Sequence, residues 1–155
     1  SSAASDVYKR QALSGAVSSL SVDMSKTYLD WTVRNFKLNG IDLNAHKVLR
    51  EDCVTWLPAN THKFDIIFLD PPTFSNSKKM KTTFDMQRDH SSLIEAACKC
   101  LNKDGTLIFS NNFKRFQMNN WILETFNCTD ITSSTIDQDF NKKKKIHKVW
   151  LIKNN

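Results

Sequence analysis

Glycine is scarce in this sequence: the chain has only Gly15, Gly40 and Gly105 among its 155 residues. Glycines so far apart cannot form the G-x-G-x-x-G motif with which many dinucleotide-binding proteins hold a pyrophosphate. Nothing else in the sequence resembles a hydride-transfer site. A nicotinamide-dependent oxidoreductase is therefore a distant alternative for this protein.

Long apolar runs are missing as well. The longest, around residues 66–69, is far shorter than the roughly 20 residues that a bilayer crossing needs, and no apolar core of a signal peptide is found. We therefore expect no membrane segment. An apolar fraction of 40% and a charged fraction of 25% are typical of a soluble globular protein, and 155 residues suffice for one domain with a real core.

The four cysteines lack the spacing of a metal site. Cys53, Cys98, Cys100 and Cys128 form no C-x-x-C pair and have no histidine partners at zinc-like spacing. We therefore predict no metal ion. Without a secretory signal, we expect reduced thiols in a cytoplasmic protein.

Positive charge, in contrast, is abundant. The net charge is +6, and much of it lies in two lysine runs at residues 77–81 and 141–145. A lysine run taken alone is usually a solvated loop. Two runs beside one candidate site favour binding of a polyanion, because lysines that neutralise phosphates release counterions.

Strands and helices are predicted to alternate along the chain. Helical spacing of Leu29, Val33 and Phe36 predicts a helix with Ser25 as its N-cap, ended by residues 39–40. The stretch 64–70, "FDIIFLD", does not alternate, which favours a strand buried on both faces of a parallel sheet. Further strands are predicted at residues 20–25, 46–52, 105–112, 128–135 and 147–153, further helices near 93–101 and 117–126, and a short helical or looped link at 54–57.

This alternation predicts a doubly wound α/β sheet with helices on both faces. The last two strands are joined through the second lysine run, which indicates a C-terminal antiparallel hairpin. In such sheets ligands bind outside the carboxyl ends of the strands.

Three of the predicted strands end in an acid. Asp23 is placed to accept hydrogen bonds from ribose hydroxyls, although a charge at a helix N-terminus explains it equally well. Asp52 is placed to accept from an adenine amino group. The third acid, Asp70, is followed by two prolines and, after Thr73, by an aromatic residue.

The motif "DPPTF" at residues 70–74 is the sharpest signal in the sequence. Two prolines stiffen the backbone just past the strand end and leave carbonyl groups free. Asp70 and the carbonyl of Pro71 can accept hydrogen bonds from a flat base, while Phe74 offers a stacking face. The structural alternative is that "DPP" only terminates the strand.

Several segments of the chain resemble one known family. They are "SVDMSKTYLDWTVRNFKLNG", "DPPTFSNSKKM", "FDMQRDH", "FSNNFKRFQM", "QDF" and "IHKVWLI". They resemble consecutive pieces of the N7-guanine, C-terminal half of the bifunctional bacterial 23S rRNA guanine methyltransferase, from about residue 12 to residue 155. The resemblance implies a Rossmann-like methyltransferase fold, S-adenosylmethionine as the cofactor, and a guanine of 23S rRNA as the methyl acceptor.

The resemblance also implies roles for individual residues. The expected catalytic residues are Asp70, Pro71 and Pro72. The expected cofactor-binding residues are Asp23, Met24, Asp52, Cys53 and Asp70. The expected RNA-binding residues are Phe74, Lys78, Lys79, Lys81, Arg88, Lys114 and Arg115. Related enzymes that methylate C5 of cytosine carry a nucleophilic cysteine where this chain has residues 110–112, "SNN", so covalent pyrimidine chemistry is not expected.

One part of the family pattern is missing. The family carries a first strand and a glycine-bearing loop that hold the amino-acid end of the cofactor, and nothing before Leu20 resembles them. We therefore expect a methyltransferase domain over residues 12–155 that lacks its first, central strand, and a non-native or disordered leader over residues 1–11. Such a fragment should be marginally stable and bind the cofactor poorly. A second methyltransferase half is expected as a fused or associated partner.

Two alternatives stay open. "DPP" followed by an aromatic is also the signature of enzymes that methylate exocyclic amino groups of nucleic acids, although the aromatic usually follows the prolines directly there. The second alternative is a basic α/β module that binds RNA through its lysine loops and has lost catalysis.

Overall fold

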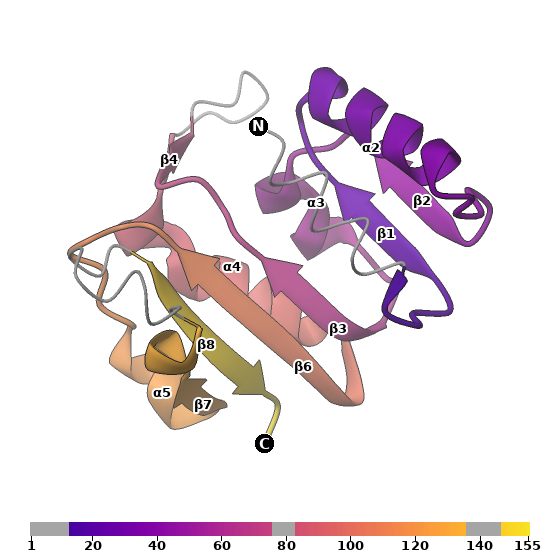
Figure 1. The fold of residues 1–155 in the computed structure, drawn as a ribbon. Helices are drawn as coiled ribbons and strands as arrows, with labels where there is room; N and C mark the ends of the chain where they lie inside the picture. Colours follow the sequence, from indigo (N-terminus) through magenta and orange to yellow (C-terminus); the bar gives the residue numbers. More distant parts are fainter. Residues whose placement is uncertain (1–12, 76–82, 136–146) are drawn as a thin grey trace. The chain divides into compact units, whose positions relative to one another are not determined.

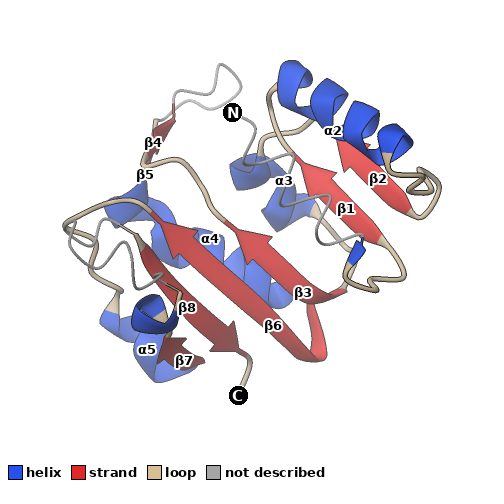
Figure 2. Cartoon of the chain, viewed as in Figure 1, coloured by secondary structure: helices blue, strands red, loops and turns tan. Residues whose placement is uncertain are grey.

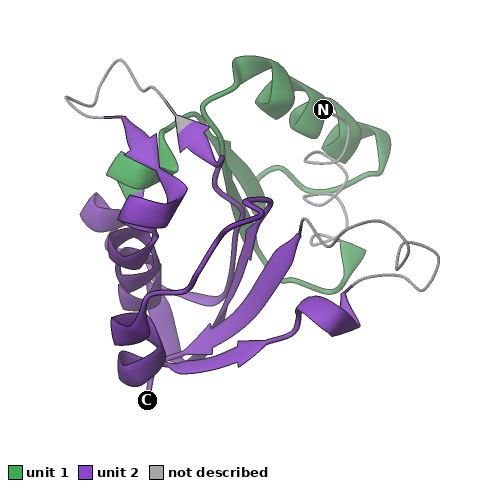
Figure 3. Ribbon diagram, turned by 90° about the vertical axis from the view of Figure 1, so that its left-hand side faces the viewer, with its two compact units in different colours: residues 1–56 green, residues 57–155 purple. Residues whose placement is uncertain are grey.

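The structure is a computed structural model that describes residues 13–75, 83–135 and 147–155 (Figure 1). The chain forms two compact units, residues 1–56 and 57–155, which are coloured separately in Figure 3. Strands alternate with helices in sequence through most of the described ranges (Figure 2), as predicted. None of the described helices is long and apolar enough to cross a membrane.

The first unit contains a two-stranded parallel sheet. Strand β1 (Ser19–Val22) pairs with β2 (His46–Leu49), and helix α2 (Lys26–Leu38) connects them. The short helix α3 (Cys53–Ala59) follows and crosses the boundary between the units. The link predicted as helical or looped is therefore helical, and Pro58 lies inside the helix.

Helix α2 begins and ends at the predicted residues. The Ser25 hydroxyl accepts a hydrogen bond from the Tyr28 N–H (3.3 Å), so that Ser25 is the N-cap. Asn39 is the C-cap, and Gly40 follows with a φ of +65°, a left-handed conformation that glycine adopts without steric cost. Leu29 and Phe36 are buried, as their helical spacing predicts.

The second unit is built on a four-stranded sheet in the order β3-β6-β8-β7. Strands β3 and β6 are parallel, and β8 is antiparallel to both of its neighbours, which confirms the predicted C-terminal antiparallel pair. The elements of this unit are β3 (Phe64–Leu69), β4 (Phe74–Ser75), β5 (Phe84–Asp85), α4 (Met86–Lys99), β6 (Leu101–Asn111), α5 (Asn120–Thr125), β7 (Asn127–Asp130), the 3₁₀ helix η1 (Thr132–Ser134) and β8 (Lys148–Lys153).

Helix α4 covers one face of this sheet (Figure 1). Ile94 and Ala97 of the helix have no exposed surface, and neither do Leu107, Phe109 and Ile152 of the strands. This apolar layer is the core of the second unit. Because β3 runs into the "DPP" turn, α4 into β6 and β6 into the segment after Asn111, the core fixes where these strands end.

Burial of β3 on both faces was predicted, and this prediction is wrong. Leu69 is 6% exposed, but Ile66 is 67% and Phe68 is 41% exposed. The reason is that β3 pairs with β6 alone among the described strands, so that one edge of β3 has no hydrogen-bonded neighbour. Likewise β1 pairs only with β2 in the described part of the chain.

Gly105 of β6 lies where neighbouring backbone approaches closely. A Cβ atom built there would lie 3.0 Å from the carbonyl oxygens of both Asn102 and Phe64, and neither backbone group moves easily. The pairing of β3 with β6 shifts register at this place, between Phe64 and Ile66.

We predict that Gly105→Ala lowers the free energy of unfolding by about 1–3 kcal/mol, because the added methyl group overpacks against two carbonyl groups. Urea denaturation followed by circular dichroism measures the change. Lys103→Ala, at an exposed position of the same strand, is the control and should leave the midpoint unchanged. Equal midpoints for Gly105→Ala and the wild type would contradict the prediction.

Candidate active site and nucleic-acid interface

Four predicted cofactor residues come together in the first unit. The backbone N–H of Asp23 donates to the carbonyl of Leu49 (3.1 Å), so that the β1–β2 ladder extends to the acid. Arg50 Nε donates to the carbonyl of Met24 (3.2 Å) and ties that residue to the end of β2. Cys53 lies close enough to Asp52 and Asp23 for both carboxylates to affect its thiol. The carboxyl ends of β1 and β2 therefore carry one acidic cluster.

Both acids of this cluster also stabilise the start of a helix. Asp23 Oδ1 accepts from the Ser25 N–H at 2.7 Å, and Asp52 Oδ1 accepts from the Val54 N–H at 3.0 Å. Within the described ranges, the Oδ2 atom of each carboxylate has no hydrogen bond, so each acid retains an acceptor for a ligand. Asp52 is only 7% exposed, and Asp23 is half-buried. Asp23 therefore has a structural role at the start of α2. That role occupies only one of its carboxylate oxygens, so it is compatible with a second role in binding a ligand.

The thiol of Cys53 is unsuited to act as a nucleophile. Burial, followed by the negative charge of Asp52, raises the pKa of Cys53 to about 11. The thiolate is therefore a rare species at neutral pH. Cys53 contributes at most a neutral packing surface or a weak donor at this edge.

Asp70 belongs to a second polar cluster, in the second unit. Leu69 of β3 lies opposite Phe109 of β6, so the next residues along the two strands, Asp70 and Ser110, are adjacent. Ser110, and His147 immediately before β8, lie close enough to the Asp70 carboxyl group to influence its pKa. Asp70 is an exposed residue, yet neighbouring protein atoms partly desolvate its carboxyl group. This desolvation raises the pKa of Asp70, while Ser110 and His147 oppose the shift.

The residues after Asp70 form a rim that is partly open to solvent. Pro71 is buried, whereas Pro72 and Thr73 are exposed, and Phe74 is 57% exposed. The carbonyl of Thr73 accepts from the Met86 N–H at 3.1 Å and anchors the rim to the start of α4. Within the described ranges the carbonyls of Pro71 and Pro72 accept no hydrogen bond. The exposed ring of Phe74 leaves an aromatic face open at the rim.

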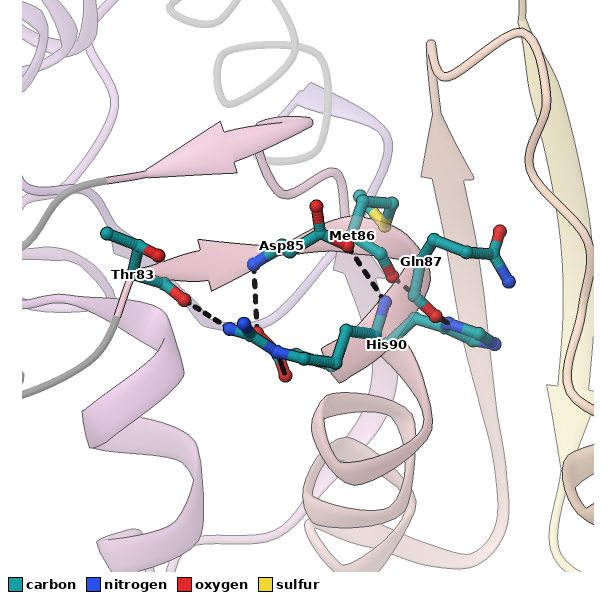
Figure 4. Close-up of polar contacts among 7 residues, drawn as sticks. Thr83, Asp85, Met86, Gln87 and His90 are labelled. Atoms are coloured by element: carbon teal, nitrogen blue, oxygen red, sulfur yellow. Dashed lines mark hydrogen bonds and ion pairs between the residues drawn. The ribbon is translucent and has the colours of Figure 1, made fainter.

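Arg88, a predicted RNA-binding residue, is engaged by the protein itself. Its guanidinium forms an ion pair with Asp89 (2.7 Å) and donates to the carbonyl of Thr83. Asp89 in turn accepts from the Asp85 N–H (2.8 Å), so the group staples β5 to the first turn of α4 (Figure 4). Arg88 remains exposed, but any phosphate would compete with Asp89 for it.

Lys114 and Arg115 are exposed in a turn that follows β6. The buried side chain of Phe116, which is 1% exposed, anchors the turn, and so does Gln87 of α4. The Gln87 side chain donates to the carbonyl of Gln117 (2.9 Å) and accepts from its N–H (3.0 Å). The two cations therefore project from an anchored turn and not from a loose loop.

His90 completes this anchor, and its role was missed in the sequence. Its Nδ1 lies 3.0 Å from the carbonyls of both Met86 and Gln87 (Figure 4), and its Nε2 accepts from the Asn119 N–H (3.1 Å). Two carbonyl partners require Nδ1 to carry the proton, so the ring is neutral. His90 is 1% exposed, and burial lowers its pKa. Its position on the apolar stripe of α4 was the available signal.

Several predicted RNA-binding lysines lie outside the described residues. Lys78, Lys79 and Lys81, and the second lysine run, fall outside the described residues. Among the residues that are described, no group of three His, Cys, Asp or Glu side chains is arranged to hold a metal ion. A shallow hollow lined by Leu101, Trp121 and Phe126 lies near the amino end of β6. It lies at the opposite end of β6 from Ser110, away from the strand end that carries Asp70.

Comparison with solved structures identifies the class to which this fold belongs. The SAM-dependent methyltransferase from Agrobacterium tumefaciens superposes with a TM-score of 0.67 at 15% identity, over 92% of this chain and 50% of that one. A candidate methyltransferase solved in complex with SAH superposes with a TM-score of 0.71 at 22% identity, over 92% and 40% of the two chains. The fold is that of the Rossmann-like methyltransferases.

The family follows from sequence. The family described as "Conserved hypothetical protein 95" matches residues 6–128, and the chain belongs to it. The ribosomal RNA large subunit methyltransferase K/L of Cellvibrio japonicus is 47% identical over 142 residues, and that of Acinetobacter baumannii (strain AYE) is 48% identical over 145 residues. These matches cover 92% and 91% of this chain but only 19% and 20% of the relatives, so the chain spans about a fifth of their length.

We predict that His90 makes stability depend on pH. Its pKa is lowered in the folded state from the ordinary 6.5, so the unfolded chain binds the extra proton more readily. Stability is therefore complete above pH 6.5 and falls as the pH drops below it, toward the folded pKa. Urea midpoints measured between pH 5 and 8 should decline less steeply for His90→Gln than for the wild type.

The control is His62→Gln, at an exposed position, which should retain the wild-type pH dependence. A His90→Gln variant that loses stability toward acid as steeply as the wild type would show that His90 is not the titrating group.

Proposed function

We propose that this chain is the catalytic part of an enzyme that transfers a methyl group from S-adenosylmethionine to N7 of a guanine in 23S rRNA. The observation that carries the proposal is the "DPP" rim after β3, where the carboxylate of Asp70 stands at the carboxyl end of a parallel strand, beside two proline carbonyls that accept no hydrogen bond from any described residue. About 48% identity to ribosomal RNA large subunit methyltransferases K/L supports it. Their greater length leaves room for a fused second methyltransferase half, acting with this one in the cytoplasm.

The acidic cluster of the first unit fits the cofactor. The Oδ2 atom of each acid accepts no hydrogen bond from the described residues, so that of Asp23 could accept from the ribose hydroxyls and that of Asp52 from the adenine amino group. Met24 is 45% exposed and offers an apolar surface beside Asp23. Cys53, with its neutral thiol, adds no charge that would repel either acid.

Transfer to a guanine N7 suits a site without a strong base. N7 presents a ring lone pair, so no proton has to be removed before the new N–C bond forms. The cofactor supplies a methyl carbon made electrophilic by its sulfonium, and that C–S bond breaks as the N–C bond forms. Alignment of the reactants contributes roughly 7–11 kcal/mol in favourable cases. Asp70 at the rim favours the positive charge that the purine acquires.

The exposed residues around the rim suit an RNA strand. Phe74 offers a stacking face to an extruded base, which costs a few kcal/mol to unstack. Lys114 and Arg115 are placed on an anchored turn to hold neighbouring phosphates. Arg88 and the lysines at positions 78, 79 and 81 belong to the same proposed interface.

The decisive test is the identity of the methylated atom. Large-subunit rRNA is incubated with labelled S-adenosylmethionine and this chain, or a chain extended by a first strand and glycine loop, and the product is mapped by mass spectrometry. We expect 7-methylguanosine, formed faster by the extended chain. Asp70→Asn should lower kcat about 100-fold, because it removes the charge that stabilises the transition state.

The control is Asp65→Asn, an exposed acid near the amino end of β3, which should leave kcat unchanged. Methylation of an exocyclic amino group would replace the proposal by the amino-methyltransferase alternative. RNA binding without methylation by either chain would replace the proposal by the other alternative, a basic module that binds RNA and has lost catalysis.

A second prediction concerns the basic turn. The double variant Lys114→Ala/Arg115→Ala should weaken RNA binding and make the slope of log K against log salt less steep by about 1.4, since each phosphate contact to single-stranded RNA contributes about 0.7. Filter binding across a salt series without cofactor measures it. The control Lys103→Ala/Lys153→Ala removes the same charge from exposed positions elsewhere on the sheet. Equal slopes for the two double variants would contradict a specific contact.

A further inference from the structure

Helix α2 carries an aromatic side chain on the face that is turned away from its own core. Leu29 and Phe36 are buried, and the ring of Phe36 lies edge-on to that of His46 in β2, with centroids 6.2 Å apart. Trp31, on the opposite side of the helix, is 46% exposed, and its ring centroid lies 5.9 Å from that of Tyr28. The core of the first unit therefore does not account for the exposed ring of Trp31.

Two cations continue the line that the two rings begin. Side chains spaced by three residues form one oblique ridge on a helix surface, and the outer ridge of α2 consists of Tyr28, Trp31, Arg34 and Lys37. Arg34 and Lys37 are exposed, and neither forms an ion pair with any residue that the structure describes. Both cations are therefore available to an anionic partner.

The charge of the helix favours an anion as well. Residues 26–38 include three cations and a single acid, Asp30. Lys37 also has a structural explanation, since a cation in the last turn complements the helix dipole. That explanation does not extend to Arg34, which precedes the last turn, or to the exposed ring of Trp31.

A second copy of this chain fits the ridge less well than a nucleic acid does. A helix of 13 residues is about 20 Å long, so its outer face alone is far smaller than the roughly 800 Å² per partner of a stable protein interface. The net charge of +6 also opposes self-association. Single-stranded RNA needs no such area, because its bases stack on single rings and its phosphates bind single cations.

We propose that the outer ridge of α2 binds single-stranded RNA. A base stacks on the ring of Trp31, and Arg34 and Lys37 hold the phosphates that follow it. Stacking of this kind tolerates any sequence, because every base has a flat face. The inference rests on the proposed function, which identifies the RNA as rRNA, and it adds a contact that none of the sequence motifs predicted.

Variants of Trp31 separate stacking from apolar packing. Trp31→Phe keeps an aromatic face, whereas Trp31→Leu keeps apolar bulk and a high helix propensity but has no ring. The probe is a fluorescently labelled oligouridylate of about 12 nucleotides, within the usual site size, and its anisotropy is measured without cofactor. We expect Trp31→Leu to weaken binding about tenfold, as the loss of one stacked base does, and Trp31→Phe to stay within about threefold of the wild type.

The cations of the ridge are tested by the salt dependence of the same binding. Arg34→Gln/Lys37→Gln should make the slope of log K against log salt less steep by about 1.4, since each phosphate contact to a single strand contributes about 0.7. Lys103→Gln/Lys153→Gln removes the same charge from exposed positions of the second unit and should keep the wild-type slope. Equal slopes for the two double variants would overturn the assignment of the cations.

Trp121→Leu is the matched control for the ring. Trp121 is 45% exposed, and its helix α5 contains no cation, so its loss should leave oligouridylate binding unchanged. Circular dichroism confirms that each variant is folded. Equal dissociation constants for Trp31→Leu and Trp31→Phe would overturn the inference, as would equal losses at Trp31 and Trp121.

Two further results separate this inference from its neighbours. A mass that doubles with concentration in the wild type but not in Trp31→Leu, measured by light scattering, would assign the ridge to a second copy of the chain and overturn the inference. If no 7-methylguanosine is formed, the proposed function fails, while binding of the oligouridylate still decides whether the ridge holds RNA.

Discussion

The parallel pairing of β3 with β6 is the contact on which the second unit depends. Its register sets Leu69 opposite Phe109, and everything polar at this edge follows from that alignment. A slip of one residue would turn every side chain of β3 to the other face of the sheet and would separate Asp70 from Ser110. The apolar layer between α4 and the sheet fixes the register, because Phe109 and Leu107 have no exposed surface.

Two acids of the first unit combine a structural contact with a possible role in ligand binding. Asp23 and Asp52 each use one carboxylate oxygen to satisfy a backbone N–H at the start of a helix. Such capping is worth about 1 kcal/mol, which is reason enough for an acid at either position. The oxygen that remains on each acid is what makes a second, ligand-binding role chemically open to the same side chain. Stability and binding are therefore not competing explanations for these residues.

The anchored turn after β6 shows how a helix can hold a functional loop that it does not contain. Gln87 and His90, one helical turn apart on α4, bind the backbone at Gln117 and Asn119. Lys114 and Arg115 are left free to face solvent because the residues beneath them carry the packing. Cations fixed in this way lose less conformational entropy on binding a phosphate than cations on a loose loop.

Sequence patterns were most reliable where the signal is local. The cap at Ser25, the ends of α2, the strands before the three acids and the antiparallel C-terminal pair were all predicted, because capping, helical spacing and apolar runs act over a few residues. Burial of β3 was predicted wrongly from its composition, since Ile66 and Phe68 need neighbours that composition does not specify. The pairing of β4 with β5, on either side of the first lysine run, was not predicted.

The sequence by itself determined which residues form helices and strands and which acids stand at their ends, because these choices depend on neighbours a few positions away. Only the tertiary structure decided that Ser110 and His147 lie near Asp70, and that the ring of His90 accepts a hydrogen bond from the Asn119 N–H. These partners lie 40, 77 and 29 positions apart along the chain, and only the register of the sheet and the packing of α4 bring them together.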